Sequence, residues 1–202
     1  MIDTMSTLDI ETHPFEPFLP KTARLLMLGT FPPSPKRWCM DWYYPNYTND
    51  MWRIMGLCFF GDKLHFVDEA NKTYRLDALK SFLSERGIAI FDTCLRVKRT
   101  KGTASDKDLE VVEPSGLDGM LKALPLCHGV LTAGRLATKI FMEHYGIGEK
   151  AKHLKMGGHV DFVFNGREIS LYRQPSSSRA YPMRLEDKAT YYGSMFKELG
   201  IL

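Results

Sequence analysis

Apolar runs and amphipathic stretches alternate along the chain. Short continuous apolar runs that stop at small or polar residues are typical of strands buried on both faces. They occupy residues 23–30, 87–93 and 128–133. Between and after them, apolar residues recur at helical spacing in residues 48–60, 76–86, 115–124, 136–145 and 185–199. Strands that alternate with helices predict a parallel sheet with right-handed crossovers.

The Asn165-Gly166 dipeptide marks a β-hairpin late in the chain, because this pair favours the tight turn that joins two antiparallel strands. Its arms are residues 160–164 and 168–172, and we expect the second arm to be the fourth strand of the core sheet. The sequence therefore predicts an α/β fold, a three-layer α/β/α arrangement around a central, mainly parallel four-stranded sheet. The remaining segments are predicted to be a frayed leader (1–12), an extended arm interrupted by three prolines (13–20) and loops (64–74 and 102–108).

Composition narrows the class of protein. The 202 residues are 44% hydrophobic and 25% charged, which fits a single domain over 1–202 with an extended arm at 1–20. The four cysteines form no C-x-x-C pair and the six histidines show no metal-binding spacing, so we expect a cytoplasmic protein without disulfides, metal or cofactor. Its apolar segments are too short to span a membrane. A net charge of +3 permits a nucleic-acid partner without requiring one, and we expect a monomer.

Three loops follow the predicted core strands, at residues 30–49, 92–108 and 174–183. In open α/β sheets ligands bind outside the carboxyl ends of the strands, so these loops are predicted to form the site. The third loop begins Gln174-Pro175 and continues through Ser176, Ser177 and Ser178 to Arg179. Such a loop can bring backbone N–H groups, hydroxyls and a guanidinium onto phosphate oxygens. A serine-rich turn is equally an ordinary start of a helix.

The first loop carries a family resemblance. The orders Gly29-Thr30-Phe31-Pro32-Pro33-Ser34 and Tyr43-Tyr44-Pro45-Asn46-Tyr47-Thr48-Asn49-Asp50-Met51-Trp52 resemble the first motif of the uracil-DNA glycosylase superfamily. They are most similar to the branch that acts on hypoxanthine in DNA, with its G-S-F-P-S and Y-Y-x-N-P-x-N-x-F-W patterns. Residues 87–92, 96 and 103–106 resemble the G-L-W-D, C-x-R and G-S-x-D segments of that branch. Residues 130–137 resemble its strand-turn-helix ending in F-N-G-x-x-A, although Ala133 replaces the Asn.

The resemblance implies a monofunctional DNA glycosylase that hydrolyses the N-glycosidic bond of uracil, hypoxanthine or xanthine in DNA and needs no cofactor. The base would leave the stack and enter a pocket that offers aromatic faces and polar edges. The pocket residues implied are Gly29, Thr30, Phe31, Tyr43, Tyr44 and Asp92. Phe31 stands where many members of the superfamily place a water-activating Asp or Asn. Phe31 can stack on a base but cannot orient water. In the hypoxanthine branch this position is also apolar and the Asn of the N-x-F-W segment is implicated instead, so the resemblance implies Asn49 as the catalytic amide.

The resemblance also assigns the serine-rich loop. Gln174 stands where the superfamily has the His or Asn of its H-P-S or N-P-S motif, and it is the second catalytic candidate. Contacts with the DNA backbone are expected from Ser34, Ser176, Ser177, Ser178 and Arg179. The residues expected to wedge into the duplex are Arg179, Tyr181 and Met183.

Other readings of these residues stay open. Asn49 is also placed to cap the following helix, Asp92 to cap a loop, and the clustered aromatics to belong to the core. The loss of the His or Asn at Gln174 leaves room for a relative that binds DNA or a nucleotide without cleaving it. A nucleotide-cofactor enzyme is a weaker reading, because no G-x-G-x-x-G or G-K-[ST] motif is present.

Overall fold

The computed structural model describes residues 9–101 and 105–202. Its central sheet has five strands in the order β5 (Ile88–Asp92), β2 (Leu25–Gly29), β8 (Gly129–Ala133), β10 (Arg167–Gln174) and β9 (His159–Phe164). The first four are parallel and β9 is antiparallel to β10. The predicted α/β architecture is confirmed. The predicted count of four strands is one short, because the first arm of the hairpin pairs with β10 along its whole length.

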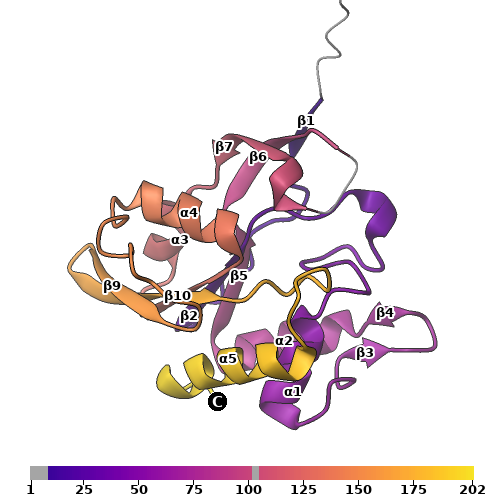
Figure 1. Cartoon of the computed structure of the whole chain (residues 1–202). Coiled ribbons are helices and arrows are strands. Elements are labelled where there is room, and N and C mark those ends of the chain that lie inside the picture. Colours follow the sequence, from indigo (N-terminus) through magenta and orange to yellow (C-terminus); the bar gives the residue numbers. More distant parts are fainter. Residues whose placement is uncertain (1–8, 102–104) are drawn as a thin grey trace, which may run out of the picture.

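Helices cover both faces of this sheet (Figure 1). On one face lie α1 (Met51–Phe60) and α5 (Leu185–Glu198), which pack against each other, with α2 (Leu76–Arg86) against β5. On the other face lie α3 (Leu117–Ala123) and α4 (Arg135–His144). The strands β2, β5 and β8 are buried at every position, as the continuous apolar runs require. No helix in the described ranges is long and apolar enough to cross a membrane.

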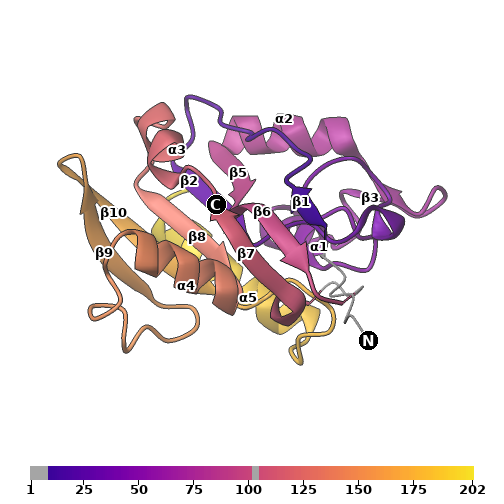
Figure 2. The ribbon, with the colours of Figure 1, turned by 90° about the horizontal axis from the view of Figure 1, so that it is seen from above.

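A second, antiparallel sheet corrects two expectations. It consists of β1 (Ile10–Thr12), β6 (Cys94–Arg99) and β7 (Leu109–Pro114), in the order β1-β6-β7 (Figure 2). Residues 10–12, predicted as part of a frayed leader, are therefore a strand, while residues 1–8 of that leader lie outside the described residues. The sequence did not reveal β6 and β7 because neither shows a regular alternation of apolar and charged residues: in β6 the buried Cys94 and Val97 are separated by two partly buried residues, and register shifts interrupt its pairing with β7.

Smaller elements complete the chain. The predicted loop at 64–74 contains a short hairpin, β3 (Val67–Asp68) and β4 (Thr73–Tyr74), and single 3-10 turns occupy η1 (Pro35–Arg37) and η2 (Asp106–Asp108). Part of the other predicted loop, residues 102–104, lies outside the described residues. Residues 13–20 run along the edge of the central sheet, where the backbone of Phe18 exchanges two hydrogen bonds with Ile90. The arm thereby covers an otherwise open edge strand.

Candidate active site

A cleft of about 1230 Å³ opens at the carboxyl edge of the central sheet. Its lining includes the last residue of each parallel strand: Gly29 of β2, Asp92 of β5, Ala133 of β8 and Gln174 of β10. Parallel strands end at one edge of a sheet, so residues far apart in the sequence meet there. The three predicted loops therefore border one cavity.

The floor of the cleft is crowded around Gly29. A Cβ atom at this position would overlap the Asp92 carboxylate and would lie 3.2 Å from the Tyr44 hydroxyl. Burial, followed by the charges of Tyr192, Asp92 and Asp106, raises the pKa of Tyr44. The hydroxyl of Tyr44 is therefore a neutral donor, and it has no hydrogen-bond partner in the described structure. A glycine here lets a carboxylate and a phenol share the end of β2.

The carboxyl group of Asp92 contacts His13, a residue of the N-terminal arm. The His13 Nε2 atom lies 2.9 Å from Asp92 Oδ2, and both side chains are buried. The other ring nitrogen, Nδ1, lies 3.0 Å from the carbonyl oxygen of Phe15, which fixes the ring plane. His13 was not among the residues predicted for the site. From the prolines and phenylalanines around His13, the sequence predicted only that residues 13–20 form an extended arm over the rest of the protein.

A second carboxyl group, Asp106, faces the same cleft. The hydroxyl of Thr30 donates a hydrogen bond of 2.9 Å to Asp106 Oδ2. Burial raises the pKa of Asp106, the Thr30 hydrogen bond opposes this, and the charge of Asp92 adds to it. In the sequence, Asp106 belongs to the segment that resembles G-S-x-D of the hypoxanthine branch, and no role was predicted for it. Two carboxyl groups of the cleft thus differ in their partners, an imidazole for Asp92 and a hydroxyl for Asp106.

Gln174 ends β10 inside the cleft, and its side chain is unusual in its hydrogen bonding. The residue is 2% exposed, yet neither Oε1 nor Nε2 has a hydrogen-bond partner in the described part of the chain. Buried polar groups in native proteins are nearly always paired with protein, water or ligand. The carboxamide of Gln174, in a residue that lines the cleft, is thus a donor and an acceptor whose hydrogen-bonding capacity is unused in the described structure.

The other predicted pocket residues divide into two groups. Phe31 lines the cleft, half-buried, with its ring against the edge of His13 and near the guanidinium of Arg99. Asn49 also lines the cleft, but its Oδ1 atom accepts a hydrogen bond of 2.9 Å from the backbone N–H of Met51 at the start of α1. Tyr43 does not line it. This residue is 1% exposed and its hydroxyl donates to the carbonyl oxygen of Glu16, as in the core reading of the aromatics.

The residues predicted to contact DNA lie on two loops. Ser176, Ser177, Ser178 and Arg179 all line the cleft, whereas Ser34 does not. Local hydrogen bonds shape the serine loop: Ser176 Oγ accepts from the N–H of Ser178, and Ser178 Oγ accepts from the N–H of Ala180. Of the predicted wedge residues, Arg179 and Tyr181 border the cleft and Met183 does not.

The rim of the cleft is strongly basic. Among the residues that the structure describes, two acidic ones line the cleft, Asp92 and Asp106. Six described basic residues line it: Arg37, Lys107, Arg135, Lys139, Arg173 and Arg179. Because the whole chain carries only +3, this edge concentrates positive charge well beyond the average surface. All but Arg179 were missed in the sequence, because they are spread over separate elements, with only Arg135 and Lys139 on the same helix.

Comparisons with known proteins identify the fold. No family model and no curated protein matches the sequence. The structure is similar to the solution NMR structure of a candidate uracil DNA glycosylase from Methanosarcina acetivorans, with a TM-score of 0.61 and 19% sequence identity. The match covers 95% of this chain and 99% of that one. The chain therefore has the fold of that protein.

Proposed function

We propose that the protein is a DNA glycosylase that removes a deaminated base by hydrolysis of its N-glycosidic bond. The observation that carries the proposal is the Gln174 carboxamide: the residue lines a cleft rich in basic residues, it is buried, and its polar atoms have no hydrogen-bond partner in the described part of the chain. The rim suits a polyanionic backbone. The carboxamide suits a base, whose edge offers both acceptors and donors.

The cleft has the parts that glycosidic hydrolysis needs. A base turned out of the helix would lie against Phe31, with Tyr44 and Gln174 at its edge. Departure of the base leaves positive charge on the sugar and negative charge on the base. The neutral donors, the Tyr44 hydroxyl and the Gln174 amide, would stabilise the anionic base without a cation. The carboxylate of Asp92, fixed by His13, would face the cationic sugar.

The attacking water is assigned to Asn49. Its Oδ1 atom already accepts the Met51 N–H, so the water would use the remaining lone pair of Oδ1 or the Nδ2 group. Positioning of this kind needs no strong nucleophile, because an oxocarbenium-like sugar reacts readily with a held water.

Incubation with duplexes that contain a single uracil, hypoxanthine or xanthine, followed by alkali cleavage, tests the proposal. We expect strand scission at one or more of these bases and none in an undamaged duplex. The motifs favour hypoxanthine. Scission that is absent for every deaminated base, in both single and double strands, would sink the assignment.

A second function is a DNA-binding relative without catalysis. It is favoured by one observation, the engagement of Asn49 Oδ1 as a helix cap. That reading predicts salt-dependent binding to DNA with no scission of any substrate, and the same panel combined with a binding titration separates the two.

A further inference from the structure

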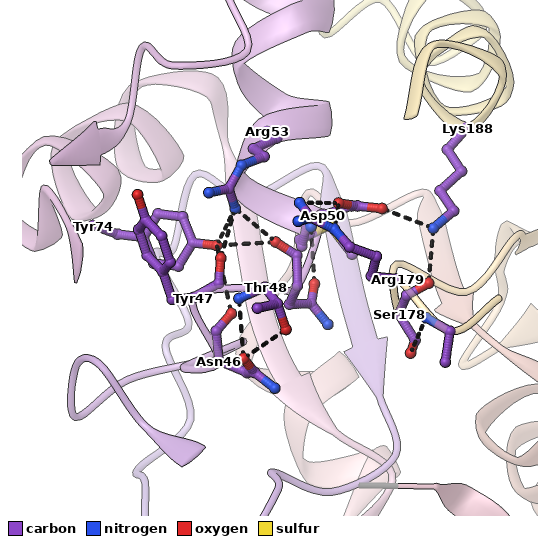
Figure 3. Close-up of polar contacts among 12 residues, drawn as sticks. Asn46, Tyr47, Thr48, Asp50, Arg53, Tyr74, Ser178, Arg179 and Lys188 are labelled. Atoms are coloured by element: carbon purple, nitrogen blue, oxygen red, sulfur yellow. Dashed lines mark hydrogen bonds and ion pairs between the residues drawn. The ribbon is translucent and has the colours of Figure 1, made fainter. Parts of the chain in front are cut away.

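Asp50, just before α1, is a buried carboxylate that binds two cations. Lys188 Nζ lies 2.9 Å from Oδ2, and Arg179 Nη2 lies 3.0 Å from Oδ1 (Figure 3). The Asp50 side chain is only 6% exposed. Neither Asp50 nor Lys188 lines the cleft, so the proposed chemistry leaves this pair without a role.

The two cations differ in their freedom to leave. The side chain of Lys188 is 0% exposed, and its ammonium also donates to the carbonyl oxygen of Ser178 at 2.8 Å. A buried ammonium separated from its carboxylate would be strongly unfavourable, so Lys188 stays. The side chain of Arg179 is 56% exposed and lines the cleft. An exposed ion pair contributes little, so Arg179 can exchange its partner.

The same contacts tie the serine loop to the start of α1. The backbone N–H of Asp50 donates to the carbonyl oxygen of Ser177 at 2.9 Å, next to the Lys188 bond to Ser178. Asn49 immediately precedes Asp50. The position of the loop relative to Asn49 therefore depends on Asp50 and Lys188 and does not require Arg179.

We propose that Lys188 is a positioning residue that keeps Arg179 available for a DNA phosphate. This inference rests on the proposed function. Lys188 neutralises Asp50 from the protein interior, so Arg179 can turn to the phosphate without leaving a buried carboxylate unpaired. Without Lys188, Arg179 would be the remaining cation on Asp50 and would be withheld from DNA.

The proposal predicts that the effect of Arg179→Ala on DNA affinity depends on whether Lys188 is present. In the unmodified protein, Arg179→Ala removes a charge-assisted phosphate contact and should weaken DNA binding about tenfold at low salt. In the Lys188→Met background, Arg179 is already committed to Asp50, so Arg179→Ala should change affinity by less than about twofold.

Binding of a fluorescein-labelled duplex with a single uracil, measured by anisotropy at several salt concentrations, gives these numbers. In Lys188→Met, the slope of log affinity against log salt should also become less steep by about 0.9, the contribution of one phosphate contact. Lys197→Met is the matched control, because it removes the same charge from an exposed position on α5. It should preserve the tenfold effect of Arg179→Ala. A merely structural role for Lys188 would alter melting without altering this dependence.

An equal loss on Arg179→Ala with and without Lys188 would overturn the inference. If Lys188→Met does not fold, as shown by circular dichroism, Lys188→Gln decides, because its amide can still donate to the Ser178 carbonyl oxygen but carries no charge for Asp50: loss of the Arg179→Ala effect in that background supports the proposal, and an unchanged tenfold effect refutes it. Failure of the unmodified protein to bind any DNA would instead refute the proposed function.

Discussion

Replacement of Gln174 by leucine should stabilise the protein and greatly slow the proposed scission of DNA. The residue is 2% exposed and both polar atoms of its carboxamide lack a partner in the described structure. A buried, unpaired polar group costs about 1–3 kcal/mol, and an apolar side chain of similar volume removes that cost. For a protein of this length, each kcal/mol corresponds to a shift of about 2–4 °C in Tm. We therefore expect Gln174→Leu to melt about 2–12 °C higher.

The same substitution removes the donor and acceptor proposed to face the base. Loss of a group that stabilises developing charge lowers kcat by about 10²–10³-fold. Calorimetry and single-turnover scission on one preparation test both expectations together. Ser115→Ala is the matched control, because Ser115 is also buried with an unpartnered hydroxyl but does not line the cleft. It should leave scission unchanged.

The reasoning fails if Gln174→Leu lowers Tm. That result would mean that the carboxamide is bonded in the free protein, for example to tightly held water, and that its polar atoms stabilise the fold. A higher Tm with normal scission would confirm that the unpaired carboxamide destabilises the fold, but it would show that Gln174 takes no part in the reaction.

Three further perturbations probe the cleft. Asn49→Ala should lose about 10²–10⁴-fold in scission rate while still binding DNA; a loss of about 1 kcal/mol in stability with normal scission per folded molecule would leave only the cap to Met51. Because burial raises the pKa of Asp106 above its ordinary 3.8, stability is lost as pH rises through that raised pKa. Asp106→Asn should therefore raise Tm at neutral pH and not below pH 3.8; melts across pH check the sign. Gly29→Ala would drive a methyl group into the Asp92 carboxylate and should cost about 1–3 kcal/mol in a denaturant titration.

The central sheet could be predicted because its strands are buried on both faces. Residues 25–29, 88–92 and 129–133 are wholly buried, and such strands appear in a sequence as unbroken apolar runs. Ligands bind outside the carboxyl ends of such strands, so the residues at which the apolar runs stop also predict the position of the cleft. The smaller sheet could not be predicted in this way. In β6 two buried residues, Cys94 and Val97, are separated by partly exposed ones, and its basic side chains dominate the pattern.

The parts of the site that sequence analysis missed depend on contacts over long separations. His13 reaches Asp92 across 79 positions, and Asp106 reaches Thr30 across 76. Neither pair has a spacing that marks it, since the arm and the loop approach the strand ends only after the sheet has formed. Gln174 was found by its place after a strand, but its unpaired carboxamide is visible only once its neighbours are in position.

The basic rim of the cleft also could not be predicted, because its residues are far apart in the sequence. Its six cationic residues are spread from Arg37 to Arg179 over four secondary-structure elements and a loop, and only Arg135 and Lys139 share an element, α4. A net charge of +3 averages them with the acidic residues of the rest of the surface. The field that a phosphate backbone meets depends on local charge within about a Debye length, roughly 8–10 Å, and is poorly represented by the net charge of the chain. For this protein, the fold gathers cationic residues that lie apart in a nearly neutral sequence, and this local concentration of charge supports the proposed DNA partner more than the net charge does.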